Sequence, residues 1–367
     1  MLKISKINFS DILSSEGAWS FKSIKMLDHF LGALIAFILP KQTIHVSSNQ
    51  SIRQILVIRP GGIGDAVFLL PILKLLKAQG VSVDILCESR NAEVFVSQGY
   101  SVYFYNQFES LGQVLRNSYD AVVDTEQWHY TSAIISYFLK TKYRIGFATR
   151  TLRAKLFNKQ VVYGDNDYEL DNFLKLFDGF LSSQQVIQNI NDSFDIPQSF
   201  QIWASEQIPE DSVTVFLGAS IALRRLSKEQ LLDIINDLLS KGFCPVLLGG
   251  KDVLDVARQI LEETEGKKVL NFVGKVSLIE SAALIQRARR FIGPDSGLMH
   301  LACSVGTSVT AVFGPGHLKK WNPRGDQHKI LTVNASCSPC TRFGNTVPTC
   351  HGSYFCMKNI KYNGDLG

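Results

Sequence analysis

The fold class is decided by the stretch Gln54-Ile-Leu-Val-Ile-Arg59, which is followed by Pro60-Gly-Gly-Ile-Gly-Asp65. The first six residues form a continuous apolar run of strand length, as expected for a buried strand. Beyond the glycine-rich turn, apolar residues recur at helical spacing from Ala66 to Gln79. A strand, a glycine-rich loop and a helix in this order predict the first unit of a doubly wound α/β domain.

The same alternation continues through most of the 367 residues. We predict further strands at residues 83–87, 100–105, 121–124, 213–217, 245–248, 269–273, 290–292 and 308–313. A polar segment at 182–201 interrupts the pattern, so we expect two facing Rossmann-like domains with parallel sheets. Because ligands bind beyond the carboxyl ends of parallel strands, the expected active site is a cleft between these domains.

The predicted organisation is a leader at 1–50, an N-terminal domain at 51–190, a C-terminal domain at 205–335 and a cysteine-rich tail at 336–367. The leader holds the strongly apolar run Phe30–Leu39, whose ten residues are half of the ~20 that cross a bilayer as a helix. Two interpretations stay open. The helix packs against the N-terminal domain, or it lies on a membrane surface between the flanking residues Lys22, Lys25 and Lys41.

The net charge of +5 arises from 38 basic and 33 acidic residues spread along the chain, so nucleic-acid binding is not indicated. A weak positive field suits a phosphate-bearing donor or an anionic membrane surface, or simply maintains solubility. A basic stretch at 147–161 is interpreted as an acceptor-side loop or domain surface. Residues 1–20 lack the pattern of a secretory signal, which predicts a cytoplasmic protein.

The loop Gly61-Gly-Ile-Gly-Asp65 is close to a dinucleotide-binding fingerprint but lacks its third glycine, because Val67 stands at that position. A nicotinamide site is therefore disfavoured. Asp65 lies where the glycine-rich turn enters a helix, at the carboxyl edge of the predicted sheet. It either caps the helix or acts as the general base that removes a proton from an attacking hydroxyl group.

A second helix start, Gly293-Pro-Asp-Ser-Gly-Leu-Met-His300, follows a short apolar strand. Backbone N–H groups from Ser296 to Leu298 are free at such a start and favour a diphosphate. Gly297 permits close approach of this ligand, and His300 is expected to donate to a phosphate oxygen. Asp295 either accepts hydrogen bonds from sugar hydroxyls or caps the helix.

Two adjacent arginines, Arg224 and Arg225, follow the glycine-bearing turn at 218–220. They either clamp the diphosphate or form a solvated surface pair. No Asp-x-Asp stands at the end of a predicted strand to hold magnesium, since Asp165-Asn-Asp167 lies in an irregular region. We therefore expect catalysis without a metal or other cofactor, with the helix dipole, arginine and histidine neutralising the leaving group.

The cysteines fall into two groups. Three lie in apolar segments and are expected to be buried thiols, namely Cys87, Cys244 and Cys303. Four are crowded into the tail, namely Cys337, Cys340, Cys350 and Cys356. In the cytosol such a cluster favours a structural zinc or iron site over disulfides, with reduced or paired thiols as the alternative.

Together these motifs resemble, in order along the chain, those of the heptosyltransferase-like glycosyltransferases of family 9. The resembling segments are 55–71, 224–227, 247–252, 274–278, 293–302, 313–316 and 356–360, within a resemblance that spans residues 25–360. The segment Arg224-Arg225-Leu-Ser departs from the family's Lys-Arg-Trp-Pro, because Leu226 replaces the tryptophan and an arginine replaces the lysine.

The resemblance implies the two-domain GT-B fold, with an acceptor-binding N-terminal domain whose loop contains Gly61, Gly62 and Gly64. It also implies an inverting, metal-independent transfer with Asp65 as general base. The C-terminal domain would bind the nucleotide sugar through Ser220, Arg224, Asp252, the backbone of Val276, Asp295, Ser296, Gly297 and His300.

The leading hypothesis is an inverting glycosyltransferase that takes an ADP-heptose-type donor and a lipopolysaccharide-core acceptor, peripheral to the inner membrane. The alternative closest to it is transfer of heptose or another sugar onto a protein, which the cysteine cluster raises. A different class is a binding protein that has kept the fold and lost catalysis. The presence of Asp65, Asp295 and His300 opposes that class.

Overall fold

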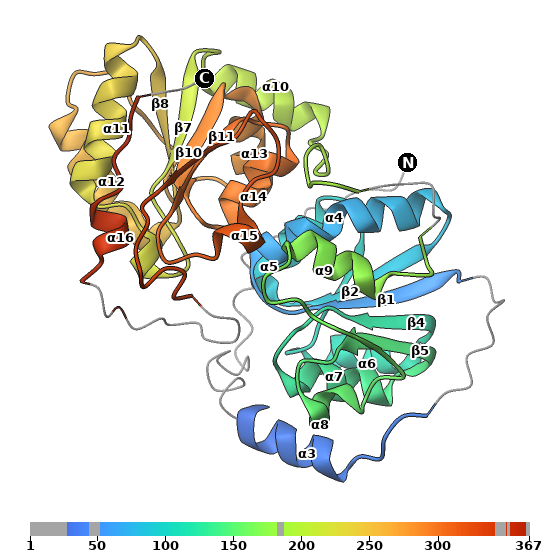
Figure 1. Cartoon of the computed structure of the whole chain (residues 1–367). Helices are drawn as coiled ribbons and strands as arrows, with labels where there is room; N and C mark the ends of the chain where they lie inside the picture. Colours follow the sequence, from blue (N-terminus) through green and yellow to red (C-terminus); the bar gives the residue numbers. More distant parts are fainter. Residues whose placement is uncertain (1–27, 44–51, 182–186, 342–349, 351–352, 365–367) are drawn as a thin grey trace. The chain divides into compact units, whose positions relative to one another are not determined.

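The computed structural model describes residues 28–43, 52–181, 187–341, 350 and 353–364 (Figure 1). The chain forms two compact units that interleave along the sequence. The first unit takes Met1–Gly61, Leu75–Tyr163 and Lys175–Leu181, and the second takes Gly62–Lys74, Gly164–Leu174 and Ser182–Gly367. The domain boundaries given above remain predictions, and residues 1–27 of the predicted leader lie outside the described residues.

The first unit contains a parallel sheet of six strands in the order β3-β2-β1-β4-β5-β6. Its strands are β1 (Gln54–Arg59), β2 (Ser82–Cys87), β3 (Ser101–Phe104), β4 (Ser118–Asp124), β5 (Lys140–Phe147) and β6 (Lys159–Val161). In register, Ile58 of β1 lies between Leu86 of β2 and Asp124 of β4. The residues that follow these strands therefore emerge at one edge of the sheet.

Helices cover both faces of this sheet, as Figure 1 shows for α5 on one face and α6 and α7 on the other. The helical elements of the first unit are η1 (Asp28–Gly32, a π-helical turn), α3 (Ala33–Ile38), α5 (Ser89–Val96), α6 (Phe108–Arg116), α7 (Tyr130–Phe138) and α8 (Thr151–Ala154). Two more helices, α4 (Ile63–Ala78) and α9 (Glu169–Leu176), are divided between the units. None of the described helices is long and apolar enough to cross a membrane.

The second unit contains another parallel six-stranded sheet, in the order β12-β11-β10-β7-β8-β9. Its strands are β7 (Ser212–Phe216), β8 (Cys244–Leu248), β9 (Leu270–Asn271), β10 (Arg290–Pro294), β11 (Val309–Phe313) and β12 (Lys329–Thr332). The prediction of an α/β fold with two parallel Rossmann-like sheets is thus confirmed.

The helices of the second unit begin where the sequence supplies a capping residue. Ser227 and Ser277 each accept a hydrogen bond from the amide three residues ahead, and Gln230 and Glu280 complete the capping boxes. The helical elements are α10 (Gln198–Gln207), η2 (Ala222–Arg224), α11 (Lys228–Ser240), η3 (Lys251–Val253), α12 (Leu254–Glu263), α13 (Leu278–Arg287), α14 (Gly297–Ser304), α15 (Leu318–Trp321) and α16 (Phe355–Lys358).

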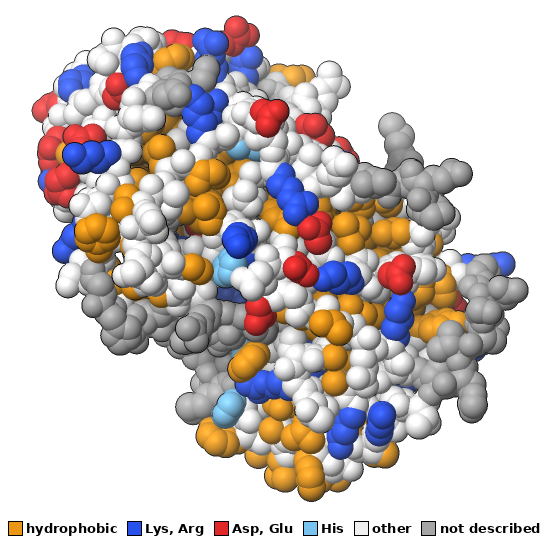
Figure 2. All heavy atoms as spheres, viewed as in Figure 1, with side chains coloured by type: hydrophobic (Ala, Val, Ile, Leu, Met, Phe, Trp, Pro, Cys, Tyr) orange, Lys and Arg blue, Asp and Glu red, His pale blue; other side chains and the backbone are white. Residues whose placement is uncertain are grey.

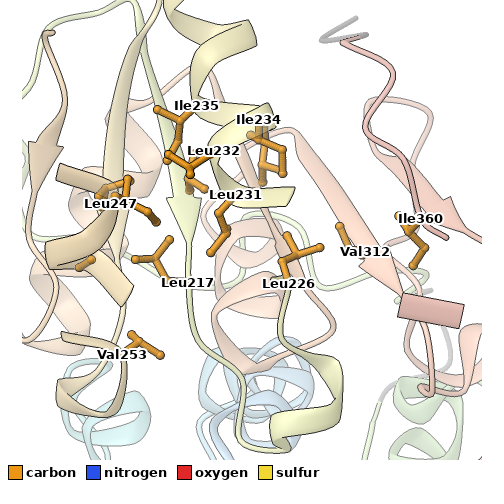
Figure 3. Packing of buried hydrophobic residues seen from close by; sticks show 14 of the residues in the cluster. Leu217, Leu226, Leu231, Leu232, Ile234, Ile235, Leu247, Val253, Val312 and Ile360 are labelled. Carbon is orange, nitrogen blue, oxygen red and sulfur yellow. The ribbon is translucent and has the colours of Figure 1, made fainter. Parts of the chain in front are cut away.

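Buried apolar side chains of α11, α12, α16 and the second sheet form one core cluster, part of which Figure 3 shows. Leu231 and Ile235 of α11 are fully buried there, as is Leu247 of β8. Leu226, which stands where the family pattern has a tryptophan, is only 8% exposed and belongs to the same core. The substitution therefore places an aliphatic side chain in the interior, directly after the two arginines.

Candidate active site

The second sheet has a topological switch point between β10 and β7. From β7 the chain proceeds through β8 to β9 on one side, and β10 to β12 extend the sheet on the other side. The loops that leave the carboxyl ends of β7 and β10 diverge at this point, which is where open α/β sheets bind ligands. These two loops carry Arg224 and Asp295, two residues of the predicted donor site.

The loop after β10 turns directly into helix α14. Ser296 is the N-cap residue, with φ −162° and ψ 168°, and its hydroxyl oxygen accepts a hydrogen bond from the amide of Met299 at 3.4 Å. The capping role weighed for Asp295 thus belongs to its neighbour, and the Asp295 side chain is available for other contacts. Gly297 and Leu298 supply the first N–H groups of the helix, which bear a partial positive charge.

Asp295 is paired with Arg224. The Arg224 Nη1 atom lies 3.0 Å from Oδ2 of Asp295 and also donates to its backbone oxygen at 3.4 Å. Asp295 is 3% exposed, and burial raises the pKa of its carboxyl group; Arg224 opposes this rise and Asp65 adds to it. Within the residues that the structure describes, the buried Nε atom of Arg224 has no hydrogen-bond partner. One buried N–H donor of this arginine therefore lacks an acceptor among the described residues.

His300 lies one turn into α14 and is buried, with 5% of its surface exposed. Burial, and then the neighbouring charge of Arg224, lowers the pKa of His300 to about 3. The imidazole is thus neutral near pH 7, where one ring nitrogen carries a hydrogen and donates. Its ring packs on Phe68 of α4 with the two centroids 4.6 Å apart.

The start of α4 lies against the start of α14, and both belong to the second unit. A Cβ atom added at Gly64 would come within 3.0 Å of the His300 ring, and one added at Gly297 would lie 2.8 Å from Cβ of Ile63. Both glycines are thus required by close packing. Asp65 follows in the same turn of α4 and is half-buried, close enough to Asp295 to raise its pKa. The predicted base and diphosphate site therefore lie near each other.

The glycine-rich loop also needs its first glycine for conformational reasons. Gly61 has φ 114°, a left-handed backbone conformation that favours glycine. At Gly62 an added Cβ atom would meet nothing within 4 Å, so packing does not require glycine there.

The other predicted donor residues follow neighbouring strands of the second sheet. Ser220 and Arg225 follow β7, Asp252 lies in η3 after β8, and Val276 lies between β9 and α13. Arg225 donates to the backbone oxygen of Ala219 and pairs with Asp252, so it braces this loop. Their contacts with a donor remain predictions.

A family model described as glycosyltransferase family 9 (heptosyltransferase) matches residues 108–351, well over half of the chain. The protein belongs to this family. It is therefore a glycosyltransferase, as the sequence motifs predicted.

Similarity to individual family members is strongest over short segments and weaker over longer ones. Lipopolysaccharide heptosyltransferase 3 of Escherichia coli is 35% identical over 92 residues, which are 24% of this chain and 27% of that protein. Lipooligosaccharide heptosyltransferase 2 of Haemophilus influenzae is 23% identical over 311 residues, 76% of this chain and 88% of that protein. The solved E. coli ADP-heptose lps heptosyltransferase II has a TM-score of 0.66 at 16% identity and covers 77% of this chain and 91% of its own. That likeness supports the predicted GT-B fold.

The first unit of this glycosyltransferase contains a buried ionic cluster that sequence analysis missed. Arg153 is fully buried; its Nη2 atom donates to Asp124 at 2.6 Å and its Nη1 atom to the Phe147 carbonyl at 2.7 Å. Arg59, 2% exposed, donates to the Thr125 carbonyl at 2.9 Å. Burial raises the pKa of Asp124 to about 6, against the opposing charge of Arg153. The interpretation of residues 147–161 as surface is therefore wrong for Arg153, which anchors the chain after β4.

Two aromatic neighbours of the site were also missed. The Arg224 guanidinium lies 5.5 Å from the ring centroid of Trp321 in α15, and Phe68 supports His300. Trp321 lies in none of the predicted motifs, and only the fold brings it to an arginine far away in sequence. Gly316 lies in the resembling segment 313–316, and a Cβ atom added there would collide with Oδ2 of Asp295.

The cysteines fall into the two predicted groups, but the zinc or iron site predicted for the four tail cysteines is not supported. Cys87, Cys244 and Cys303 are buried free thiols. The four tail cysteines line one hollow together with Leu223 and Pro315. Across the part of the chain that the structure describes, no three His, Cys, Asp or Glu side chains are placed so that they could hold a metal ion. Cys337 is exposed, and Sγ of Cys350 accepts a hydrogen bond from the Tyr354 amide at 3.1 Å.

Proposed function

We propose that this glycosyltransferase transfers heptose from ADP-heptose to a hydroxyl group of a lipopolysaccharide-type acceptor, with inversion and without a catalytic metal. The observation that carries the proposal is the start of α14, where Arg224, Asp295 and His300 lie beside the α4 turn that holds Asp65. The donor and acceptor classes are supported by the names of the similar proteins, which include an ADP-heptose lps heptosyltransferase and a lipooligosaccharide heptosyltransferase.

In the proposed reaction, Asp65 accepts the proton of the acceptor hydroxyl group. The hydroxyl oxygen attacks the anomeric carbon from the face opposite the diphosphate, so a new C–O bond forms as the bond to the leaving oxygen breaks. The leaving diphosphate takes the bonding electron pair. Direct displacement of this kind inverts the configuration at the anomeric carbon.

The developing charge on the diphosphate would be met by three kinds of donor near the start of α14. These donors are the free N–H groups of α14, the Arg224 guanidinium, whose buried Nε–H lacks an acceptor, and the neutral His300 imidazole. Asp295 holds the Arg224 guanidinium and would accept hydrogen bonds from sugar hydroxyl groups. Leu298 and Gly297 leave the helix start free of charged side chains.

The decisive experiment measures nucleotide release and product formation by wild type, Asp65→Asn and Asp255→Asn. Removing the base is expected to lower turnover by about 10²- to 10⁴-fold while ADP binding is kept. Asp255→Asn, whose side chain is 90% exposed in α12, is the matched control and should keep full activity. Equal activity of Asp65→Asn and wild type would exclude the proposed base.

The substrates are tested separately with a panel of nucleotide sugars and acceptors. ADP-heptose is expected to be turned over in the presence of EDTA, and NMR of the product should show an inverted anomeric centre. Preference for a UDP-linked sugar would overturn the donor assignment, and transfer only to a polypeptide would overturn the acceptor. Absence of turnover with every donor, together with a thermal shift by ADP, would favour the binding-protein class.

A further inference from the structure

The helix formed by η1 and α3 presents its large apolar side chains to solvent. Four of them are more than half exposed: Phe30 at 72%, Leu34 at 55%, Phe37 at 68% and Ile38 at 71%. The small residues Gly32 and Ala36 occupy the inner side and are buried. An ordinary surface helix has the reverse arrangement, with large apolar residues inward and polar residues outward. One face of Phe30–Leu39 thus packs against the first unit as one interpretation predicted, whereas contact of the other face with a membrane stays a prediction.

The orientation of this helix is fixed by specific contacts with α7 and α8. Asp28 accepts hydrogen bonds from the amide of Tyr130 at 2.9 Å and from the hydroxyl of Thr131 at 2.7 Å, and so caps α7. At Gly32 a Cβ atom would lie 2.8 Å from Cβ of Tyr130, so a larger residue would push the helix away. Ala36 packs with Leu156 and Phe157. The outward face therefore cannot rotate inward without breaking these contacts.

Positive charge surrounds the exposed face. Lys155 donates to the carbonyl oxygen of Phe37 at 2.9 Å, and its Nζ atom lies 5.9 Å from the Phe37 ring centroid. Lys41 is exposed just beyond the helix. The neighbouring sequence from 127 to 163, which includes α7, β5 and α8, contains no acidic residue and seven basic ones, of which Arg153 is buried and paired with Asp124 and the other six are at least partly exposed. In Figure 2, apolar side chains gather at the lower end of the picture, where Figure 1 draws α3.

We propose that the outward face of η1 and α3 docks on an anionic lipid bilayer, with the helix lying in the plane of the headgroups. A basic-flanked apolar helix face suits this position, because its side chains enter the acyl boundary while lysines meet lipid phosphates. A second copy of this chain is a poorer occupant, since a symmetric contact would bring the same positive charges together. The inference rests on the helix alone and does not depend on the proposed donor or acceptor.

The test is flotation of the full chain with vesicles of phosphatidylcholine alone or mixed with phosphatidylglycerol. Wild type is expected to float with the mixed vesicles, and less so at high salt. The variant Phe37→Ser/Ile38→Ser should bind more weakly on the order of tenfold or more, because two apolar side chains no longer enter the bilayer. Lys41→Glu should weaken binding to the mixed vesicles only.

Phe108→Ser is the matched control, because Phe108 is 90% exposed on α6 and lies outside the docking face. It should bind vesicles as wild type does. Circular dichroism should show unchanged unfolding for all variants, since the substituted side chains make few internal contacts. Equal flotation of the double variant and wild type, or no flotation of wild type, would overturn the proposal. The proposal would also be overturned if wild type formed a dimer, the double variant were a monomer, and neither protein bound vesicles.

Discussion

At the residue scale, the buried His300 links the site to the pH dependence of stability. In the folded protein burial lowers its pKa to about 3, whereas an unfolded histidine titrates near its usual value of about 6.5. The unfolded chain therefore binds the proton more readily, and stability is lost as pH falls below about 6.5. Between pH 7.5 and 5 this one group is expected to cost wild type about 2 kcal/mol of unfolding free energy.

The measurement compares urea unfolding of wild type and His300→Gln at these two pH values. The variant should lose about 2 kcal/mol less than wild type, because glutamine does not titrate. The difference isolates His300, since Asp124 and the other titrating groups are present in both proteins. His29→Gln, which removes an exposed imidazole, controls for loss of a histidine elsewhere. Identical pH dependence of His300→Gln and wild type would contradict the assignment.

Residues whose roles follow from local rules were predictable, and those that depend on long-range contacts were not. The free helix start at 295–298 and the need for glycine beside it follow from capping and close approach. The pairing of Arg224 with Asp295 joins residues that are 71 positions apart, which no local pattern encodes. The same holds for Arg153 and Asp124, whose burial turns a stretch that looks like charged surface into an interior anchor.

At the scale of elements, the cap that Asp28 provides for α7 predicts a measurable loss of stability. Asp28→Ala removes hydrogen-bond acceptors from the first turn of α7 and from Thr131, which is expected to cost about 1–2 kcal/mol. Hydrogen exchange should become faster at the amides of Tyr130 and Thr131. His29→Ala removes an exposed side chain in the same turn as Asp28 and should leave those amides protected. Unchanged exchange in Asp28→Ala would show that η1 does not cap α7.

The strands that the sequence predicted are those with apolar runs, whether they lie inside a sheet, as β1 and β10 do, or at an edge, as β3 and β9 do. β1 has the predicted bounds, and β7, β8 and β10 differ from the predicted ones by a residue or two. Three strands were missed, namely β5, β6 and β12. β5 begins with alternating charged residues, and β6 and β12 are short edge strands that are only partly buried, so none shows a continuous apolar run.

At the scale of the whole molecule, the two units are not consecutive pieces of chain. The second unit takes Gly62–Lys74 and Gly164–Leu174 from within the sequence of the first. Sequence patterns reveal where strands and helices alternate, but they do not reveal to which core a connecting helix contributes. The segment at 164–174 is held in the second unit by Lys320 and Arg324, both of which follow β11.

The ion pair between Lys320 and Glu169 tests this attachment. The two side chains are 3% and 1% exposed and 3.4 Å apart, and Lys320 also approaches the carbonyl oxygens of Gly164 and Asp165. Glu169→Gln leaves a buried ammonium group without its countercharge and is expected to cost about 3–5 kcal/mol of unfolding free energy. Lys320→Met in the same chain removes that unpaired charge, so the double variant should be more stable than the sum of the two single losses predicts.

Urea unfolding of the four proteins in this cycle gives the coupling energy, which should exceed about 1 kcal/mol. The exposed pair Arg258 and Glu262 on α12 serves as the matched control, since water screens it and its cycle should give almost no coupling. Strictly additive losses at Lys320 and Glu169 would mean that the pair does not form in solution. This ion pair would then not hold the segment at 164–174 in the second unit.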